Sequence, residues 1–221
     1  IHCGLVGSEM CIRDRYIPDV SHISVDTDLN RFELDFFALD TNNLAAEIEL
    51  IKTKYPEFGK IYFENFLNIP FDQPLAENQA TFIKGYIYSA LSRHLRDTCQ
   101  VVFGDMADLK KDFDQAFQFF NYYFPDQPIP SVTTYLSEFT LANFIYRNNA
   151  LAVSLDFFLG ATYPYQEYNP GIPNFSNYLV RSFNKDHLVS KTLKPLVQDM
   201  LGAPGGEKML DIMIHNGKEL Y

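Results

Sequence analysis

The sequence lacks the features that mark a membrane-spanning or nucleic-acid-binding chain. It has no run of about 18 or more apolar residues, the length that a bilayer-spanning helix needs. Its longest cluster of basic residues is Lys110-Lys111, and 28 acidic against 18 basic residues give a formal charge of −10. This charge repels phosphate backbones, so we expect no nucleic-acid partner and no polybasic contact with lipids.

Cysteine is scarce, and two of the three cysteines lie in a segment that differs from the rest. Residues 1–15 show neither helical nor alternating periodicity, and they contain Cys3 and Cys11. The stretch from Val6 to Arg15 resembles the translated sequencing-adapter tail of metagenomic protein predictions, so we treat residues 1–15 as non-native. Cys99 is then the single cysteine of residues 16–221, which excludes an internal disulfide.

Motifs for the common catalytic and phosphate-binding sites are absent. The sequence contains no HExxH, GxSxG, GxGxxG or Walker-type phosphate loop, and Cys99 lacks a nucleophile signature. Its five histidines lie far apart in the sequence, and His187 is only a weak candidate for a metal ligand. We therefore expect no enzymatic activity, no metal and no cofactor. A pair of glycosidase carboxylates has no sequence pattern, so the acidic residues leave that possibility open.

Aromatic residues are abundant, with 20 phenylalanines and 14 tyrosines but no tryptophan. We interpret them mainly as large rings packed between helices and a small sheet, with an exposed aromatic surface for a partner as the alternative. A chain of 221 residues with 47 % hydrophobic content suffices for one domain with one core.

Helical spacing of apolar residues recurs in both halves of the chain. The clearest case is Leu109, Phe113, Phe117, Phe120 and Phe124, spaced by 4, 4, 3 and 4. The final pattern, with Met209, Leu210, Met213, Leu220 and Tyr221 facing inward, has no stop signal, so we expect a chain truncated at its C-terminus. The spacing predicts helices at 44–55, 58–66, 81–97, 107–124, 186–201 and 206–221.

Alternating apolar residues predict short strands at 22–26, 131–140 and 150–159, while 31–37 fits strand and helix equally. The turn-prone Asn148-Asn149 suggests that the last two strands form an antiparallel pair. We therefore expect an α+β fold, a mainly helical single domain with a small antiparallel sheet.

Asp156 is the carboxylate of most interest, because it lies on the face of the 150–159 strand opposite the aliphatic row. It would either face solvent or cap the turn at Gly160, and we favour such a structural role. The residues from Tyr163 to Pro173 are rich in proline and glycine and predict an ordered loop.

Several short segments stand out when they are taken together. They are Pro18, Arg31–Glu33, Lys54–Phe58, Tyr123–Pro125, Val153–Gly160, Tyr163-Pro164 and Met213–Tyr221, and the most specific are an LDxFLG block and a terminal GKxLY block. In this order and spacing they resemble the GldB family of gliding-motility lipoproteins from Bacteroidota, and the resemblance covers almost all residues after 15. Its motif residues are Asp156, Leu159, Gly160, Pro164, Gly217, Lys218 and Tyr221.

The resemblance implies a non-enzymatic lipoprotein of the cell envelope that supports gliding and the associated type IX secretion machinery. Residues 16–221 would form one GldB-like domain, with its membrane contact made only through a lipidated cysteine upstream. Its partners would be other envelope, gliding or secretion components.

The family is also distantly similar to zincin-like proteins, in which an edge strand precedes a zinc-binding helix. By that analogy, 151–159 would be the edge strand, and the helix after Asp186 would be the metal helix. Here His187 is followed by neither a glutamate nor a second histidine, which implies a protease-like scaffold without its metal. Two alternatives remain open: a zincin-like hydrolase with a divergent or incomplete site, and a periplasmic peptide- or glycan-binding module with a deep aromatic-lined pocket.

Overall fold

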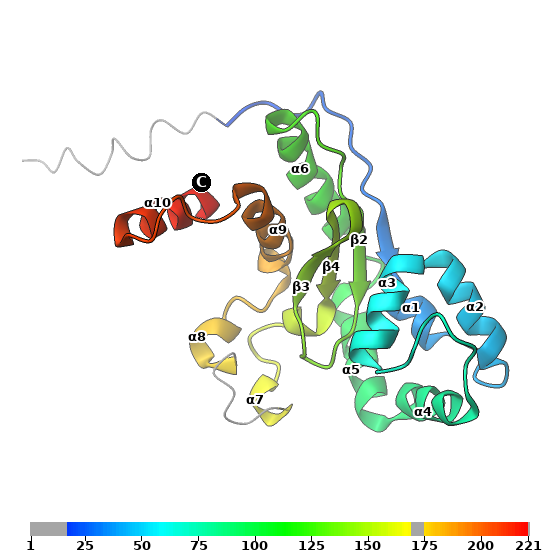
Figure 1. Ribbon diagram of the computed structural model, residues 1–221. Coiled ribbons are helices and arrows are strands. Elements are labelled where there is room, and N and C mark those ends of the chain that lie inside the picture. The colour runs from blue at the N-terminus through cyan, green and yellow to red at the C-terminus, as the bar shows by residue number, and fades with distance from the viewer. Residues whose placement is uncertain (1–16, 169–174, 221) are drawn as a thin grey trace, which may run out of the picture.

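After one short strand, helices occupy the first half of the described chain, the other three strands of a small sheet follow, and helices close it (Figure 1). The computed structural model describes residues 17–168 and 175–220. The strands are β1 (Leu29–Arg31), β2 (Val132–Tyr135), β3 (Asn143–Tyr146) and β4 (Ala150–Ser154). The α-helices are α1 (Phe32–Phe37), α2 (Leu44–Lys54), α3 (Pro56–Ile61), α4 (Glu77–Tyr88), α5 (Ala90–Phe103), α6 (Ala107–Tyr123), α7 (Tyr165–Tyr168), α8 (Asn177–Val180), α9 (Lys185–Leu201) and α10 (Met209–Leu220). A π-helix, η1 (Tyr62–Phe66), and two 3-10 helices, η2 (Arg147–Asn149) and η3 (Leu155–Phe158), complete the set. The predicted α+β class, mainly helical with one small sheet, is confirmed.

The sheet is mixed, so the predicted antiparallel pair is wrong in direction. The strand order is β1-β2-β4-β3, and β2 runs parallel to both β1 and β4. The predicted segments do meet, with Val132 opposite Leu151. The Asn148-Asn149 turn joins β4 to β3, a strand that the sequence pattern did not predict, and these two are antiparallel. The chain reverses direction between β2 and β3 and again between β3 and β4, so β4 runs parallel to β2.

The predicted strand at 22–26 is not formed. Instead, this segment runs along α6, where the Gln118 Nε2 donates to the Ile23 carbonyl at 2.9 Å and the Thr27 N–H donates to Asp114 Oδ1 at 2.7 Å. The strand lies a few residues later, and the ambiguous segment 31–37 divides between the end of β1 and α1.

Two predicted elements are interrupted. The helix expected at 81–97 is two helices, because Ser89 takes an extended conformation and its Oγ caps α5 by accepting from the Ser92 N–H at 3.1 Å. The strand expected at 150–159 ends at Ser154, and the chain then winds into η3. Helix α9 continues through Pro195 and ends at Leu201, and Gly202 caps it with a positive φ of 63°.

The C-terminal helix α10 corrects another expectation. Met209, Leu210 and Met213 were predicted to point inward, but all three side chains are exposed. Tyr221 and the side chain of Leu220 lie outside the described residues. No helix of residues 17–168 and 175–220 combines the length and apolar character needed to cross a bilayer.

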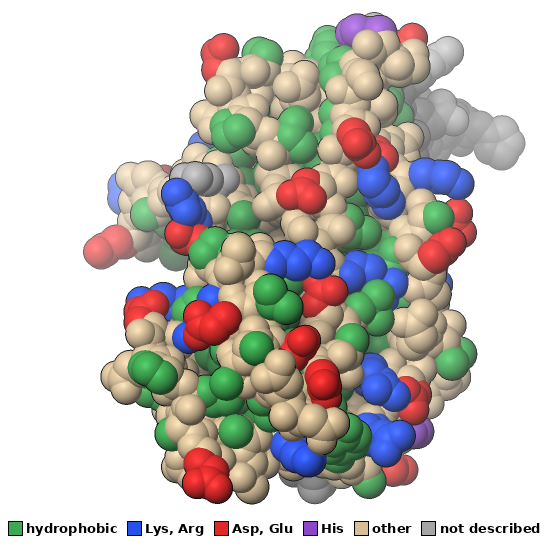
Figure 2. Space-filling view, turned by 90° about the vertical axis from the view of Figure 1, so that its right-hand side faces the viewer, with side chains coloured by type: hydrophobic (Ala, Val, Ile, Leu, Met, Phe, Trp, Pro, Cys, Tyr) green, Lys and Arg blue, Asp and Glu red, His purple; other side chains and the backbone are tan. Residues whose placement is uncertain are grey.

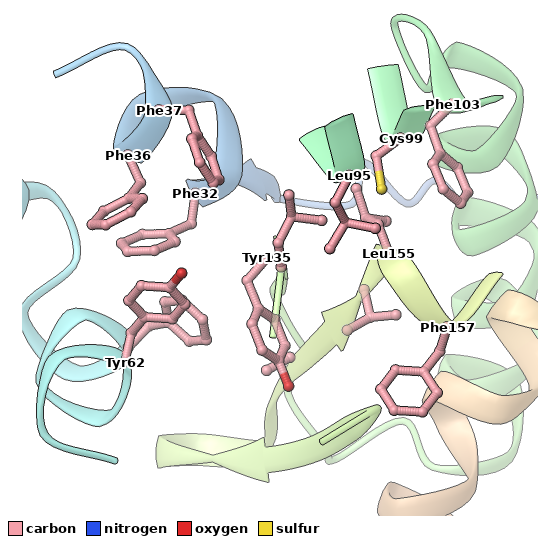
Figure 3. Close-up of a cluster of buried hydrophobic side chains, with 14 of the residues drawn as sticks. Phe32, Phe36, Phe37, Tyr62, Leu95, Cys99, Phe103, Tyr135, Leu155 and Phe157 are labelled. Atoms are coloured by element: carbon pink, nitrogen blue, oxygen red, sulfur yellow. The ribbon is translucent and has the colours of Figure 1, made fainter. Parts of the chain in front are cut away.

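Aromatic rings form much of the core, in agreement with the main interpretation of their abundance. Phe32 is 1 % exposed, and its ring centroid lies 4.7 Å from that of Tyr62 and 4.9 Å from that of Phe58. Figure 3 shows the three phenylalanines of α1 facing Tyr62, with Tyr135 of β2 between this group and Leu155. The aromatic rings therefore connect α1, η1 and the sheet.

On the surface, charged side chains are mixed. Figure 2 looks at the side that carries α2, α3 and α4, and it shows acidic and basic side chains interspersed.

We predict that Phe32→Ala lowers the free energy of unfolding by about 3–5 kcal/mol, because it opens a cavity at the centre of the aromatic cluster. Phe82→Ala is the matched control, since Phe82 on α4 is 51 % exposed, and its cost should be within about 0.5 kcal/mol. Urea denaturation of both variants measures the difference. Equal losses would contradict the central position of Phe32.

Candidate functional site

Polar side chains gather where the parallel strands β2 and β4 end. Ser137 and Glu138 follow β2, while Ser154 and Asp156 end or follow β4. Parallel strands place their carboxyl ends at one edge of a sheet, which is where α/β proteins bind ligands. We call Ser137, Glu138, Ser154 and Asp156 the carboxyl-edge cluster.

Asp156 is the centre of this cluster and is fully buried. Its Oδ2 accepts hydrogen bonds from the backbone N–H groups of Ser137 at 3.1 Å and Phe139 at 2.9 Å. Its Oδ1 accepts from the Ser154 hydroxyl, which also lies 2.9 Å from Ser137 Oγ. The carboxylate therefore ties the end of β4 to the turn after β2. The sequence predicted that Asp156 would face solvent or cap the turn at Gly160, and both expectations are wrong.

The turn held by Asp156 has an unusual backbone. Glu138 and Phe139 both adopt positive φ angles, 52° and 62°, a region that costs non-glycine residues free energy. In this turn, the N–H groups of Ser137 and Phe139 donate to the Asp156 carboxylate and not to a helix or strand carbonyl. Ser137 Oγ accepts from the Thr140 N–H at 3.2 Å and completes the support.

Burial raises the pKa of the Asp156 carboxyl from 3.8 to about 6, although its hydrogen bonds act in the opposite direction. Among the described residues, no lysine, arginine or histidine forms a salt bridge with it. Its hydrogen bonds come from the two N–H groups and the Ser154 hydroxyl, and the Ser137 hydroxyl lies 3.5 Å from Oδ2. A carboxyl group in this setting is a candidate functional group by its perturbed pKa, but it has no opening to solvent.

Glu138 extends the cluster toward the helices. Its Oε1 accepts from the Ser92 hydroxyl of α5 at 2.8 Å, and Ser92 Oγ lies 2.6 Å from Ser89 Oγ. Burial, together with the negative charge of Glu138, raises the pKa of the Tyr86 phenol on α4. Glu138 is half-buried and is the member of the cluster closest to solvent. Glu138 carries no motif that would mark it in the sequence; the available signal is that an acidic residue directly follows the β-rich segment 131–137.

A second buried acidic group lies at the end of β1. Glu33 accepts from Arg31 Nε at 2.8 Å and from the Thr134 hydroxyl at 2.6 Å. Arg31 Nη1 also donates to the Gly104 carbonyl at 2.6 Å. Burial raises the pKa of the Glu33 carboxyl, while Thr134 and Arg31 oppose the rise. This Arg31–Glu33 pair joins β1, β2 and the turn between α5 and α6.

The other motif residues near Asp156 have backbone roles. The Leu159 N–H donates to the Tyr165 hydroxyl at 2.8 Å, and the Gly160 N–H donates to the Phe183 carbonyl at 2.7 Å. Gly160 has φ of 105°, a conformation that strains any L-residue. Pro164 is exposed at the start of α7. The LDxFLG block therefore positions the chain that follows β4 against Tyr165 and Phe183.

The remaining predicted residues do not join this cluster. His187 is exposed at the start of α9, and its Nδ1 lies 2.8 Å from Asn184 Oδ1. Cys99 is buried on α5, and burial raises the pKa of its thiol, which disfavours the reactive thiolate. Gly217 and Lys218 are exposed on α10, and Tyr221 lies outside the described residues.

Neither a metal-binding group nor an aromatic cavity accompanies the cluster in the described residues. Within residues 17–168 and 175–220, no three histidine, cysteine or acidic side chains are arranged to hold a metal ion. A cavity of about 440 Å³ lies between Arg31 and Lys110, and another of about 330 Å³ lies between Asn43 and Lys84. Neither cavity is lined by an aromatic side chain, and neither includes the carboxyl-edge cluster. The hydrogen bonds of the cluster hold the turn at Glu138 and Phe139.

Comparison with known proteins adds one match. A family model described as "Gliding motility protein GldB" matches residues 13–221, nearly the whole chain. No curated protein and no solved structure matches significantly.

Asp156→Asn should remove a pH dependence of stability. The raised pKa means that the contribution of Asp156 is complete below about pH 4 and is lost as the pH rises through about 6. The amide can keep the geometry, with its oxygen accepting the two N–H groups and its NH2 donating to Ser154 Oγ. Between about pH 4 and 7, the free energy of unfolding should therefore fall by about 2 kcal/mol more in the original chain than in the variant. Denaturant titrations at both pH values test this, and parallel pH profiles would refute it.

Arg31→Met should destabilise the fold by about 3–5 kcal/mol at neutral pH, because it leaves the Glu33 carboxylate buried without its cation. Adding Glu33→Gln should restore part of the loss, since a neutral amide needs no counter-charge. Lys54→Met, which breaks the more exposed pair with Asp35, is the control and should cost less than about 1 kcal/mol. Thermal or urea unfolding compares the three, and no recovery in the double variant would contradict the electrostatic explanation.

Proposed function

The chain belongs to the family of the gliding motility protein GldB, and on this basis we propose that it is a lipid-anchored envelope protein that supports gliding and the associated type IX secretion machinery. The family match over residues 13–221 carries the proposal. Its acidic surface and mixed charges suit contacts with other envelope proteins better than contacts with nucleic acid.

We propose a scaffold or assembly role in place of catalysis. Burial raises the pKa of two carboxyl groups, Glu33 and Asp156. Glu33 accepts a hydrogen bond from Thr134, far along the chain, and Asp156 accepts one from Ser137 on the neighbouring strand connection. Buried hydrogen bonds of this kind make a domain rigid, and a rigid domain suits a protein that holds other components in place. Other gliding or secretion components would bind to the surface of this rigid domain.

Deleting the gene in its gliding host should abolish colony spreading and the movement of single cells. Re-expression of the full-length gene should restore both, and the export of a type IX substrate should follow the same pattern. Spreading is measured on agar and export by analysis of the culture medium. Unchanged gliding in the deletion strain would contradict the proposed role, and unchanged export alone would restrict it to gliding.

The non-enzymatic part of the proposal has its own check. Metal analysis of the purified chain and of His187→Ala, together with a peptidase and glycosidase screen, should give no stoichiometric metal and no turnover. Zinc that is bound by the original chain and lost in His187→Ala would favour the hydrolase alternative.

A further inference from the structure

The outer edge of β3 is not completed by any other described segment of the chain. The strand order is β1-β2-β4-β3, so β3 pairs with β4 on one side and has no strand of the described residues on the other. Figure 1 shows β3 at the side of the sheet opposite β1. Such an edge presents backbone donors and acceptors to which another strand can pair.

The ladder with β4 fixes which backbone groups of β3 point outward. The Ser154 N–H of β4 donates to the Ala142 carbonyl at 2.7 Å, so the backbone of Ala142 faces β4. The bonding direction alternates along a strand, and the backbone groups of Phe144 and Tyr146 therefore face β4 as well. The residues between them face the other way.

Asn143 and Ile145 are these outward-facing residues. Each has one N–H and one C=O directed away from β4, and none of the four groups is hydrogen-bonded to another residue of the ranges 17–168 and 175–220. Their spacing of two residues is that of one side of a β-strand. The edge thus presents two donor–acceptor pairs in the order that an antiparallel strand matches.

Neighbouring segments cover the faces of β3 and leave its edge accessible. On one face, the Phe144 ring lies 5.8 Å from that of Tyr135 and 6.3 Å from that of Phe58. Helix α9 contacts both β3 and β4, so it lies against a face of the sheet and not along its outer edge. The four residues of β3 are half-buried, in contrast to those of β2 and β4, which are buried.

Composition distinguishes this edge from the one at β1. Strand β1 has three residues, Asp28 precedes it, and its last residue, Arg31, bonds to Glu33. Charge and short length are the usual protection of a sheet edge against another strand. Residues 141–146 contain no charged residue, no proline and no glycine, and three of the four residues of β3 are aromatic or β-branched. The β3 edge therefore lacks that protection and favours strand addition.

The groups at the edge select what can occupy it. Alternating N–H and C=O groups are matched by an extended polypeptide, and sugars or lipid headgroups do not offer that repeat. Side chains of the added strand would lie beside Phe144 and Tyr146, where apolar or β-branched residues pack well. A formal charge of −10 opposes an acidic segment, and it also opposes a second copy of this chain, which carries the same charge.

We propose that β3 binds an extended segment of another protein, which joins the sheet antiparallel to β3 as a fifth strand. The segment is neutral or basic, and apolar or β-branched side chains occupy every second position. The proposal rests on the proposed scaffold role and adds a contact to it: another component binds through the backbone groups of Asn143 and Ile145. Backbone bonds supply the affinity, and the alternate side chains supply the specificity.

The probe for this edge is a synthetic peptide of alternating threonine and valine with a lysine at each end. Amide hydrogen exchange is followed by NMR on the 221-residue chain, alone and with the peptide. In the chain alone, the N–H groups of Asn143 and Ile145 should exchange quickly, while those of Phe144 and Tyr146, which are bonded to β4, should exchange slowly. Peptide at about ten times its Kd should slow the exchange of Asn143 and Ile145 roughly tenfold.

Two matched controls isolate the backbone contact. The same peptide with every threonine and valine N-methylated keeps its side chains but loses the N–H donors between its ends, and it should slow neither exchange. In the chain, Asn143→Pro removes one outward N–H at the first position of the strand, where proline is tolerated, whereas Asn143→Ala keeps it. Asn143→Pro should weaken peptide binding about fivefold, the effect of one net hydrogen bond, and Asn143→Ala should bind like the original chain. Circular dichroism checks that both variants fold, and the N-methylated peptide tests the proposal without any change to the chain.

The charge of the peptide gives a separate readout. The same peptide with a glutamate at each end should bind more weakly in low salt, and added salt should reduce the difference. Equal binding of the two peptides in low salt overturns the choice of a neutral or basic segment.

Each other outcome overturns strand addition itself. Slow exchange of Asn143 and Ile145 in the chain alone shows that the chain's own residues already cover the edge. No response to the peptide, or an equal response to its N-methylated form, removes the backbone contact. Sedimentation that reveals a dimer, lost in Asn143→Pro, assigns the edge to a second copy of the chain. Because no living cell is involved, failure here leaves the gliding phenotype untouched, and unchanged gliding leaves a positive peptide result standing.

Discussion

One buried carboxylate determines how the sheet is connected. Asp156 holds the N–H groups of Ser137 and Phe139, and this fixes the left-handed turn that sends the chain from β2 back into β3. The turn leaves room for β4 between β2 and β3, and it places the Phe139 ring against Phe157 at 5.9 Å. The rest of the second half follows from that geometry, because the same ring contacts Tyr165 and thus the segment that leads to α9.

A second constraint joins the two halves of the fold. The Arg31–Glu33 pair lies where β1 meets α1, and Thr134 on β2 bonds to the same carboxylate. Without these bonds, β1 would offer only three residues of ladder to the sheet edge. Buried pairs contribute little net free energy compared with apolar replacements, but they are demanding in geometry. Here the pair fixes the position of α1, with its phenylalanines, beside β1 and β2.

The sequence predicted the helices better than the sheet, for physical reasons. The apolar spacing of α6 is a local property, so Leu109, Phe113 and Phe117 were sufficient to identify it. Strand direction depends on partners distant in the chain, and the pattern could not show that Asn143–Tyr146 would take the place beside β4. A structural role was predicted for Asp156, but at the turn of Gly160 and not at the turn after β2. That turn contains two residues with positive φ, Glu138 and Phe139, and neither is a glycine that would mark it in the sequence. For α10, periodicity located the helix, but the same periodicity is satisfied by an apolar side that faces outward.

The parallel pairing of β1 with β2 also bears on the order in which the protein can fold. Leu29 pairs with Val132, more than 100 residues later, so this edge of the sheet closes only after most of the chain is available. The Phe58 ring packs at 5.4 Å from Tyr135, which means that the aromatic core of the first half is incomplete until β2 arrives. A polypeptide exported from its N-terminus would therefore present these rings to its surroundings during passage, when chaperones are most needed. The same long-range pairing that unites the two halves leaves the rings of the first half unprotected until synthesis has reached the sheet.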